Sequence, residues 1–158
     1  MSATYAYRWT QKIPVCLLRW MINFWPPYLG TGIWIEKITD DFRTITVRMS
    51  LRWYNRNYVG THFGGSMYAM TDPFYMLMLI KNLGENYIVW DKAAYIEFKK
   101  PGKDTLRATF AFTREEIQAI RHQADMNEKF VFDRPVDLFD QEGRIVARVV
   151  KTLYVRKK

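Results

Sequence analysis

The chain has 158 residues, of which 49% are hydrophobic and 16% aromatic, and its formal net charge at pH 7 is +8. This length suits one domain, and the composition supplies enough apolar surface for a core, which excludes a disordered chain. A single cysteine, Cys16, excludes an intrachain disulfide and a cysteine-based metal site, and with only His62 and His122 we expect no zinc site. One cysteine also suits a reducing compartment, so we expect a cytoplasmic protein.

An apolar segment occupies residues 13–25 and contains one charge, Arg19. It is shorter than the roughly 20 residues that span a bilayer, and it lacks a small-residue cleavage site. We therefore expect neither a transmembrane segment nor a signal peptide. The pattern predicts an N-terminal helix, either buried against the core or lying on a membrane surface. Pro26-Pro27 is expected to end this helix, because proline removes a backbone donor.

Two strands are predicted next, at 32–39 and 43–53, with a turn at Asp40-Asp41. The second strand alternates between apolar and polar residues, as expected for an antiparallel strand that is buried on one face. Its apolar face comprises Ile45, Val47, Met49, Leu51 and Trp53.

Residues 65–82 form an apolar segment that ends before Gly84, a typical residue beyond a helix C-terminus. Apolar side chains occupy nearly the whole circumference, which predicts a helix wrapped on all sides. Within it, Asp72-Pro73 also resembles a helix start, with aspartate as the N-cap and proline at the first helical position. The alternative is therefore a break at 72, with Asp72 capping the second half.

The remaining chain alternates strongly enough to predict four more strands and one helix. A capping box at residues 113–116 opens a helix over about 114–126. The strands are expected at 87–99, 104–112, 130–139 and 144–156. Together these elements predict a single α+β domain over 1–158, an antiparallel sheet around one buried helix.

The region most informative about chemistry is residues 57–72, a loop that ends in Gly64-Gly65 and leads into the apolar segment carrying Asp72. Two glycines let the backbone pass close to a ligand, and the free N–H groups at a helix start attract negative charge. This region is the first candidate for a functional site.

Motif spacing in this region resembles that of a known family. Asn57, Gly60, Gly64, Gly65 and Asp72 match Asn-x-x-Gly-x-x-His-Gly-Gly, with an acidic residue eight positions after the first glycine of the pair. The chain thus resembles hot-dog fold acyl-CoA thioesterases of the phenylacetic-acid-pathway type over about residues 30–156. Residues 98–106 resemble the family's Phe-x-x-Pro-x-x-Gly-Asp segment, shortened between proline and glycine. The Trp/Pro-rich start and the phenylalanine before the glycines resemble an uncharacterised thioesterase-like branch.

The resemblance implies an acyl-CoA thioesterase with three catalytic residues. Gly64 would donate its N–H to the oxyanion, Asp72 would act as general base or nucleophile, and Asn57 would hold the attacking water. Structural alternatives remain for each residue: a tight turn at the glycines, a helix cap at Asp72 and a turn residue at Asn57.

One departure from the motif concerns the family's histidine, which is Phe63 here, while His62 lies one position earlier. Lys99, Lys100 and Lys103 suit the phosphates of coenzyme A, although a solvated basic turn is the alternative. The predicted substrate-binding residues are Gly65, His62, Phe63, Tyr68, Tyr75, Lys99 and Lys100.

By resemblance, the site lies at a subunit interface, which implies a homodimer or a dimer of dimers. No metal or redox cofactor is implied, and coenzyme A enters only as part of the substrate. A non-catalytic module that binds acyl-CoA or a fatty acyl chain is the main alternative. Binding of nucleic acid or anionic lipid is a third possibility, but the basic residues are dispersed and no nucleic-acid motif occurs, so we expect no nucleic-acid partner.

Overall fold

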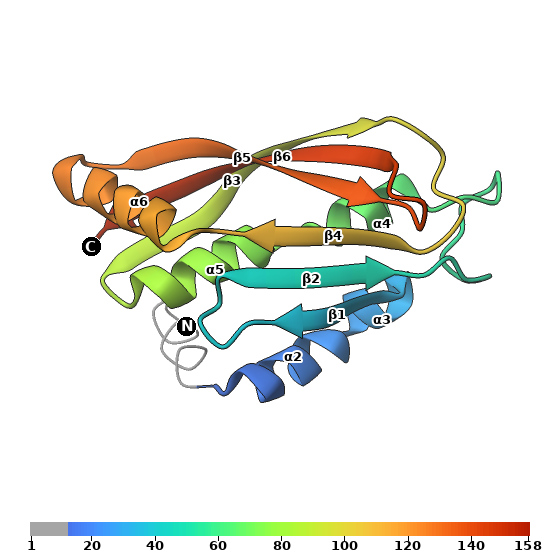
Figure 1. Cartoon of the computed structure of the whole chain (residues 1–158), viewed down its shortest axis with the longest axis horizontal. Helices are drawn as coiled ribbons and strands as arrows, with labels where there is room; N and C mark the ends of the chain where they lie inside the picture. Colours follow the sequence, from blue (N-terminus) through green and yellow to red (C-terminus); the bar gives the residue numbers. More distant parts are fainter. Residues whose placement is uncertain (1–12) are drawn as a thin grey trace.

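The computed structural model describes residues 13–158, which form a six-stranded antiparallel sheet with helices around it (Figure 1). The strand order is β1-β2-β4-β5-β6-β3, so β1 and β3 are the two edges. The strands are β1 (Ile33–Ile38), β2 (Thr44–Met49), β3 (Tyr87–Phe98), β4 (Leu106–Ala111), β5 (Phe130–Phe139) and β6 (Ile145–Lys157). The helices are α2 (Val15–Asn23), α3 (Pro26–Thr31), α4 (Gly64–Ala69), α5 (Phe74–Leu83) and α6 (Arg114–Met126).

The core lies between the sheet and the central helix α5. Inward-facing residues of the strands are apolar, and α5 buries most of its circumference against them. Phe110 of β4 is fully buried, and its ring centroid lies 5.0 Å from those of Phe74 and Tyr75 on α5. The expectation of an antiparallel sheet around one buried helix is therefore confirmed.

The second predicted strand is shorter than expected. Ile45, Val47 and Met49 are fully buried as predicted, but β2 ends at Met49 and Trp53 is 79% exposed. The cause is Asn55, a buried side chain that accepts a hydrogen bond from the Arg52 backbone N–H at 2.7 Å and donates to the Ser50 carbonyl at 2.8 Å. These bonds close a turn, so the alternation continues in the sequence after the strand has ended.

The predicted helix over 65–82 is two helices, α4 and α5, with a break at residues 70–73. Proline lacks the N–H that would continue the helical hydrogen bonds, and α5 starts directly after Pro73. The predicted break is therefore present, but the predicted cap is wrong. Asp72 makes no capping hydrogen bond, and Pro73 occupies the N-cap position.

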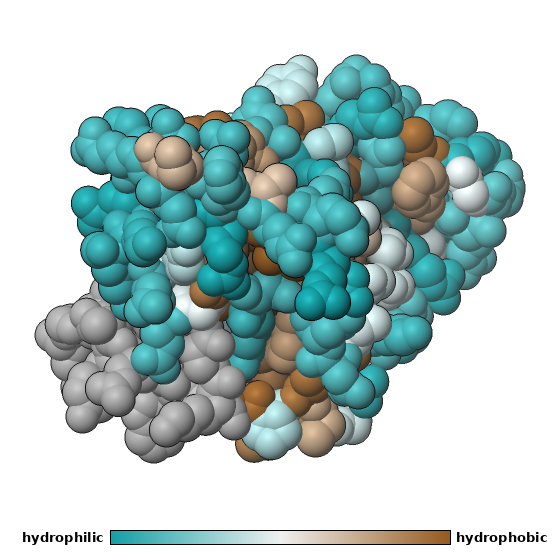
Figure 2. Space-filling model, turned by 60° about the vertical axis from the view of Figure 1, so that its left-hand side comes forward, coloured by the Kyte–Doolittle hydropathy of each residue, from teal (hydrophilic) through white to brown (hydrophobic). Residues whose placement is uncertain are grey.

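The N-terminal helix is present as α2, and Pro26-Pro27 opens a further short helix, α3. Proline suits the first helical positions because the N–H groups there have no helical acceptor. The inner side of α2 packs on β1 and buries Leu18 and Asn23, which agrees with the first alternative, a helix buried against the core. The outer side of α2 and α3 remains apolar and exposed, through Leu17, Trp20, Met21, Phe24, Trp25 and Leu29. Elsewhere the surface is mostly hydrophilic, as Figure 2 shows for one face.

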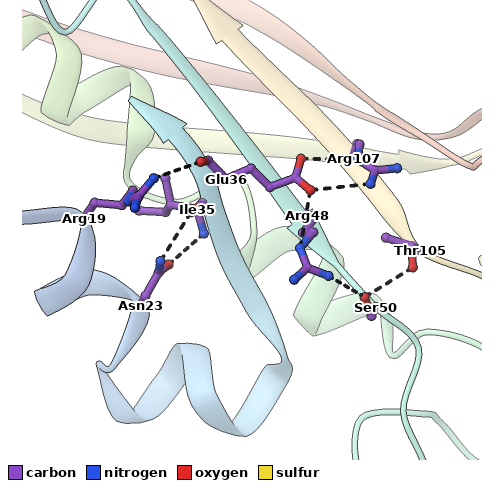
Figure 3. Close-up of polar contacts among 8 residues, drawn as sticks. All are labelled: Arg19, Asn23, Ile35, Glu36, Arg48, Ser50, Thr105 and Arg107. Carbon is purple, nitrogen blue, oxygen red and sulfur yellow. Dashed lines mark hydrogen bonds and ion pairs between the residues drawn. The ribbon is translucent and has the colours of Figure 1, made fainter. Parts of the chain in front are cut away.

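Polar side chains of α2 satisfy the free backbone of the edge strand β1 (Figure 3). Asn23 accepts a hydrogen bond from the Ile35 N–H at 2.7 Å and donates to the Ile35 carbonyl at 3.3 Å. Arg19 donates to the Glu36 carbonyl at 3.1 Å. An edge strand with unpaired backbone groups invites aggregation, and here the helix covers that edge.

Replacing Asn23 with alanine is expected to lower the free energy of unfolding by about 2–3 kcal/mol, because the buried Ile35 groups lose both partners. Urea denaturation followed by circular dichroism measures this loss. Asn127→Ala is the control, since within residues 13–158 that exposed amide bonds only to Gln123 of α6. Equal losses in the two variants would contradict a special role for Asn23.

On the outer face of the sheet, basic residues are paired with acidic ones. Glu36 contacts Arg48 at 3.3 Å and Arg107 at 3.2 Å, which ties β1 to β2 and β4 (Figure 3). Arg48 is one of the dispersed basic residues that a nucleic-acid surface would need. Its pairing with Glu36 reduces the local positive charge, which disfavours a phosphate-binding surface on this face.

The second half of the chain follows the predicted elements closely. Thr113 accepts a hydrogen bond from the Glu116 N–H at 3.1 Å, and the Glu116 carboxylate accepts one from the Thr113 N–H at 2.8 Å. This reciprocal capping box starts α6, which covers the end of the sheet near the C-terminus (Figure 1). Strands β3, β4, β5 and β6 lie within two residues of their predicted bounds.

Candidate functional site

A groove of about 620 Å³ lies where the loop that ends in Gly64-Gly65 meets the turn after β3. Its walls are apolar at Met67 and Phe98 and basic at three lysines. The lining residues are Asn57, Val59, Thr61, His62, Gly64, Met67, Phe98, Lys99, Lys100, Pro101 and Lys103. The fold thus brings together parts of the two segments that resemble the family motifs, residues 57–72 and 98–106. The groove between them has an apolar surface beside a positive one.

Gly64 opens α4 at the wall of this groove. The carbonyl of Phe63 accepts hydrogen bonds from the N–H groups of Ser66 and Met67, at 3.0 and 3.2 Å. Within residues 13–158 no acceptor takes the N–H of Gly64, which leaves that donor available to a ligand. A Cβ atom at Gly64 would lie 2.9 Å from the end of the exposed Phe98 ring, so a larger residue there would displace this aromatic wall.

Asn57 uses its side chain within the loop. The amide nitrogen donates to the Thr61 hydroxyl at 2.9 Å and to the His62 carbonyl at 3.2 Å. The amide oxygen accepts from the N–H groups of Val59 and Thr61, at 3.1 and 3.0 Å. This geometry supports the alternative of a turn residue, because both ends of the amide already hold residues 57–62 in place.

His62 fastens the loop to the segment after β3. Its backbone N–H donates to the Gly102 carbonyl at 2.9 Å, and its ring Nε2 lies 2.7 Å from the Asp104 carbonyl oxygen. A carbonyl only accepts, so Nε2 carries the proton. Among residues 13–158 the buried Nδ1 has no hydrogen-bond partner. Burial lowers the pKa of His62, which favours the neutral ring. His62 therefore lines the groove as a neutral ring, and its Nδ1 is a hydrogen-bond acceptor.

Other predicted substrate-binding residues do not line the groove. Tyr75 is buried in the core, where its hydroxyl donates to the Pro135 carbonyl at 2.8 Å, and it does not line the groove. Phe63 and Tyr68 are exposed, and neither lines the groove. Gly65 is also outside the lining set, and a Cβ there would overlap the Phe63 ring.

Asp72 lies outside the groove, in the break between α4 and α5. Its Oδ1 is 3.1 Å from the Lys151 ammonium, while 47% of its side chain is exposed. The main chain is held separately, because the Tyr28 hydroxyl donates to the Asp72 carbonyl at 2.5 Å. Burial, followed by the nearby charge of Asp72, raises the pKa of Tyr28, so this donor stays protonated.

Lys151 is the residue that sequence reasoning missed. It lies on β6 with a side chain only 1% exposed, and its ammonium also contacts Asp91 of β3 at 2.7 Å. The signal in the sequence was its position in the alternation of β6, since the inward-facing positions around it are apolar. They are Ala147, Val149, Leu153 and Val155. A charge in such a row commonly marks a functional site.

The architecture described above is the hot-dog fold, in which an antiparallel sheet wraps around a long central helix. Similar solved structures include PA5026 from Pseudomonas aeruginosa, a protein of unknown function described as a probable thioesterase, with a TM-score of 0.83 and 18% identity over 92% of this chain and 97% of that one. OLEI01261 from Chlorobaculum tepidum, of unknown function, has a TM-score of 0.68 and 15% identity over 88% and 91% of the two chains.

The thioesterase HI1161 from Haemophilus influenzae has a TM-score of 0.65 and 15% identity over 92% of each chain. No curated protein matches the sequence. The family model described as "Domain of unknown function (DUF4442)" matches residues 15–155. The chain therefore belongs to the DUF4442 family, a hot-dog family whose structural neighbours include proteins described as thioesterases.

Proposed function

We propose that the protein hydrolyses the thioester bond of an acyl-CoA. The observation that carries this proposal is the groove at the start of α4, where the free N–H of Gly64 lies beside an apolar wall and three lysines. An acyl-CoA has matching parts: a carbonyl that needs a hydrogen-bond donor, an apolar acyl chain, and phosphates that attract lysine.

In the proposed reaction, the carbonyl oxygen of the thioester accepts the Gly64 N–H and becomes an oxyanion when the carbonyl carbon is attacked. Asp72 removes a proton from the attacking water as general base; alternatively, its carboxylate attacks directly and water hydrolyses the resulting anhydride. The carbon–sulfur bond breaks, and the coenzyme A thiolate leaves and takes up a proton. The products are a carboxylic acid and a free thiol, and water is the only co-reactant.

We further propose a homodimer, because the groove of one chain lacks Asp72. Strand β3 is a free sheet edge, and its residues Ala93, Ala94 and Tyr95 are exposed, with Tyr95 67% exposed. Pairing of two β3 edges would bury these residues and bring Asp72 of one copy towards the groove of the other. A dimer of dimers remains compatible with this arrangement.

A cytoplasmic location is also proposed, supported by Cys16, which is a free and exposed thiol. Within residues 13–158 no helix is both long enough and apolar enough to cross a bilayer.

The test is release of free thiol from short, long and aromatic acyl-CoAs by the purified protein. We expect hydrolysis of at least one chain class at a rate well above the spontaneous rate. A second candidate is a binding module without turnover, which the position of Asp72 outside the groove favours. Tight binding of a non-hydrolysable acyl-CoA thioether, with no thiol release from any member of the panel, would support the binding module and contradict hydrolysis.

A further inference from the structure

A buried charge cluster links three elements of the fold beside the central helix. The Lys151 ammonium on β6 contacts Asp91 of β3 at 2.7 Å and Asp72, between α4 and α5, at 3.1 Å. It also lies 5.0 Å from the centroid of the Tyr68 ring on α4, a cation–π contact. The lysine is 1% exposed, the Asp91 side chain 16% and the Asp72 side chain 47%.

Filling this space with charged side chains is energetically unfavourable compared with apolar packing. Removing an ammonium and a carboxylate from water carries a large desolvation penalty, and an apolar residue of similar volume often gives a more stable core. The rest of the inward-facing row on β6 is apolar, so packing alone would favour leucine or methionine at 151. The position of the charge therefore calls for a role beyond packing.

A β-bulge in β3 directly follows the second carboxylate, Asp91. Asp91 pairs with Leu153 and Ala93 with Thr152, so the ladder shifts by one residue at Lys92. Cross-strand partners share a face of the sheet, and Leu153 faces the core. Asp91 therefore faces inward beside Lys151, whereas the next inward position, opposite Lys151, is Ala94. Bulges of this kind frequently re-aim a side chain next to an active site.

The cluster fixes one half of the Asp72 carboxylate and leaves the other half free. Lys151 donates to Oδ1. Among residues 13–158 no hydrogen-bond donor contacts Oδ2, although the Asp91 carboxyl lies close enough to interact with Asp72, and nearly half of the Asp72 side chain faces solvent. A carboxylate held in this way has one oxygen oriented by the protein and one oxygen available to accept a proton or to attack.

We propose that Lys151 is the positioning residue for Asp72 and that Asp91 holds Lys151 in place from the opposite side. This inference rests on the proposed thioesterase function, in which Asp72 is the base or nucleophile. Burial alone would lower the pKa of Lys151, but its bonds to Asp91 and the nearby charges of Asp91 and Asp72 raise it overall, so the residue remains an ammonium. Lys151 therefore orients Asp72 with a permanent charge.

The test compares Lys151→Met with the native protein, using the acyl-CoA that the panel identifies. Methionine fills a similar volume without charge. We expect kcat to fall about 30-fold or more while KM changes less than about twofold, because the groove that binds the substrate is untouched. Leu153→Met, a conservative change in the same inward-facing row, is the control and should leave kcat unchanged.

A merely structural role for Lys151 is separated from positioning by a double variant. If Lys151 acts through Asp72, the variant Lys151→Met/Asp72→Asn will be no slower than Asp72→Asn alone. Multiplied losses in the double variant would overturn the inference. If Lys151→Met does not fold, Asp91→Asn takes its place, and we expect the same loss of kcat at constant KM.

Two failures are distinguishable. A Lys151→Met protein that keeps the native kcat, while Asp72→Asn loses it, would overturn the positioning role and leave the thioesterase function standing. A native protein that releases no thiol from any acyl-CoA would overturn the proposed function and the inference together. An active native protein whose Asp72→Asn variant is equally active would overturn the inference and the assignment of Asp72, while the hydrolysis itself would stand.

Discussion

Replacing Asp72 with asparagine is expected to lower kcat for acyl-CoA hydrolysis by about 10²–10⁴-fold, the range usual for loss of a positioned general base. An amide has nearly the shape of a carboxylate but does not take a proton from water at neutral pH. KM should change little, because Asp72 does not line the groove. The measurement is steady-state thiol release over a range of acyl-CoA concentrations.

The substitution is expected to leave the fold intact. The backbone contacts of Asp72, the Tyr28 hydrogen bond to its carbonyl and its N–H bond to the Ala69 carbonyl, do not involve the carboxylate. The asparagine oxygen is still able to accept the Lys151 hydrogen bond. Loss of activity in this variant therefore reports on chemistry.

Asp137→Asn is a matched control. Asp137 also forms an ion pair, with Arg148 at 2.7 Å, but on strands β5 and β6 of the sheet and outside the groove. We expect this control to retain native kcat and KM. A similar fall of kcat in both variants would show that the loss follows from a general change of charge, and the assignment of Asp72 would then be wrong.

The sequence predicted those features of the helices and strands that depend on local patterns. Alternation placed the buried face of β2, and the capping box at residues 113–116 placed the start of α6, because both depend on neighbouring residues. The end of β2 was missed, because it depends on Asn55, whose side chain accepts a hydrogen bond from the Arg52 N–H and closes a turn. Side-chain to backbone bonds of this kind leave no periodic signal.

The candidate site also has one part that local sequence patterns identify and one part that they do not. Motif spacing identified Gly64, His62, Lys99 and Lys100, which line one groove together, because each lies in a short segment with a recognisable pattern. The Asp72–Lys151 pair joins residues 79 positions apart in the sequence. The third member, Asp91, lies on β3, and one sequence contains no direct sign that β3 pairs with β6.

The lysines of the groove should act on substrate binding and not on the chemical step. Lys99 forms an ion pair with Glu97, whereas within residues 13–158 no acidic partner contacts Lys100 or Lys103. These two ammonium groups are therefore more available to phosphates. For Lys100→Gln/Lys103→Gln we expect KM for acyl-CoA to rise about 5–30-fold, from roughly 0.5–1 kcal/mol for each exposed charge pair.

A phosphate-free substrate tests whether these lysines act by binding phosphate. The double variant should hydrolyse an N-acetylcysteamine thioester of the same acyl group at the native rate, since that compound offers no phosphate to lysine. Raised salt should reduce the difference between native and variant KM for acyl-CoA, because exposed charge pairs are screened. The control, Lys37→Gln/Lys129→Gln, removes the same charge outside the groove. If KM rose equally for both thioesters, or equally in the control variant, the lysines would act through the general electrostatic field of the protein and not by binding phosphate.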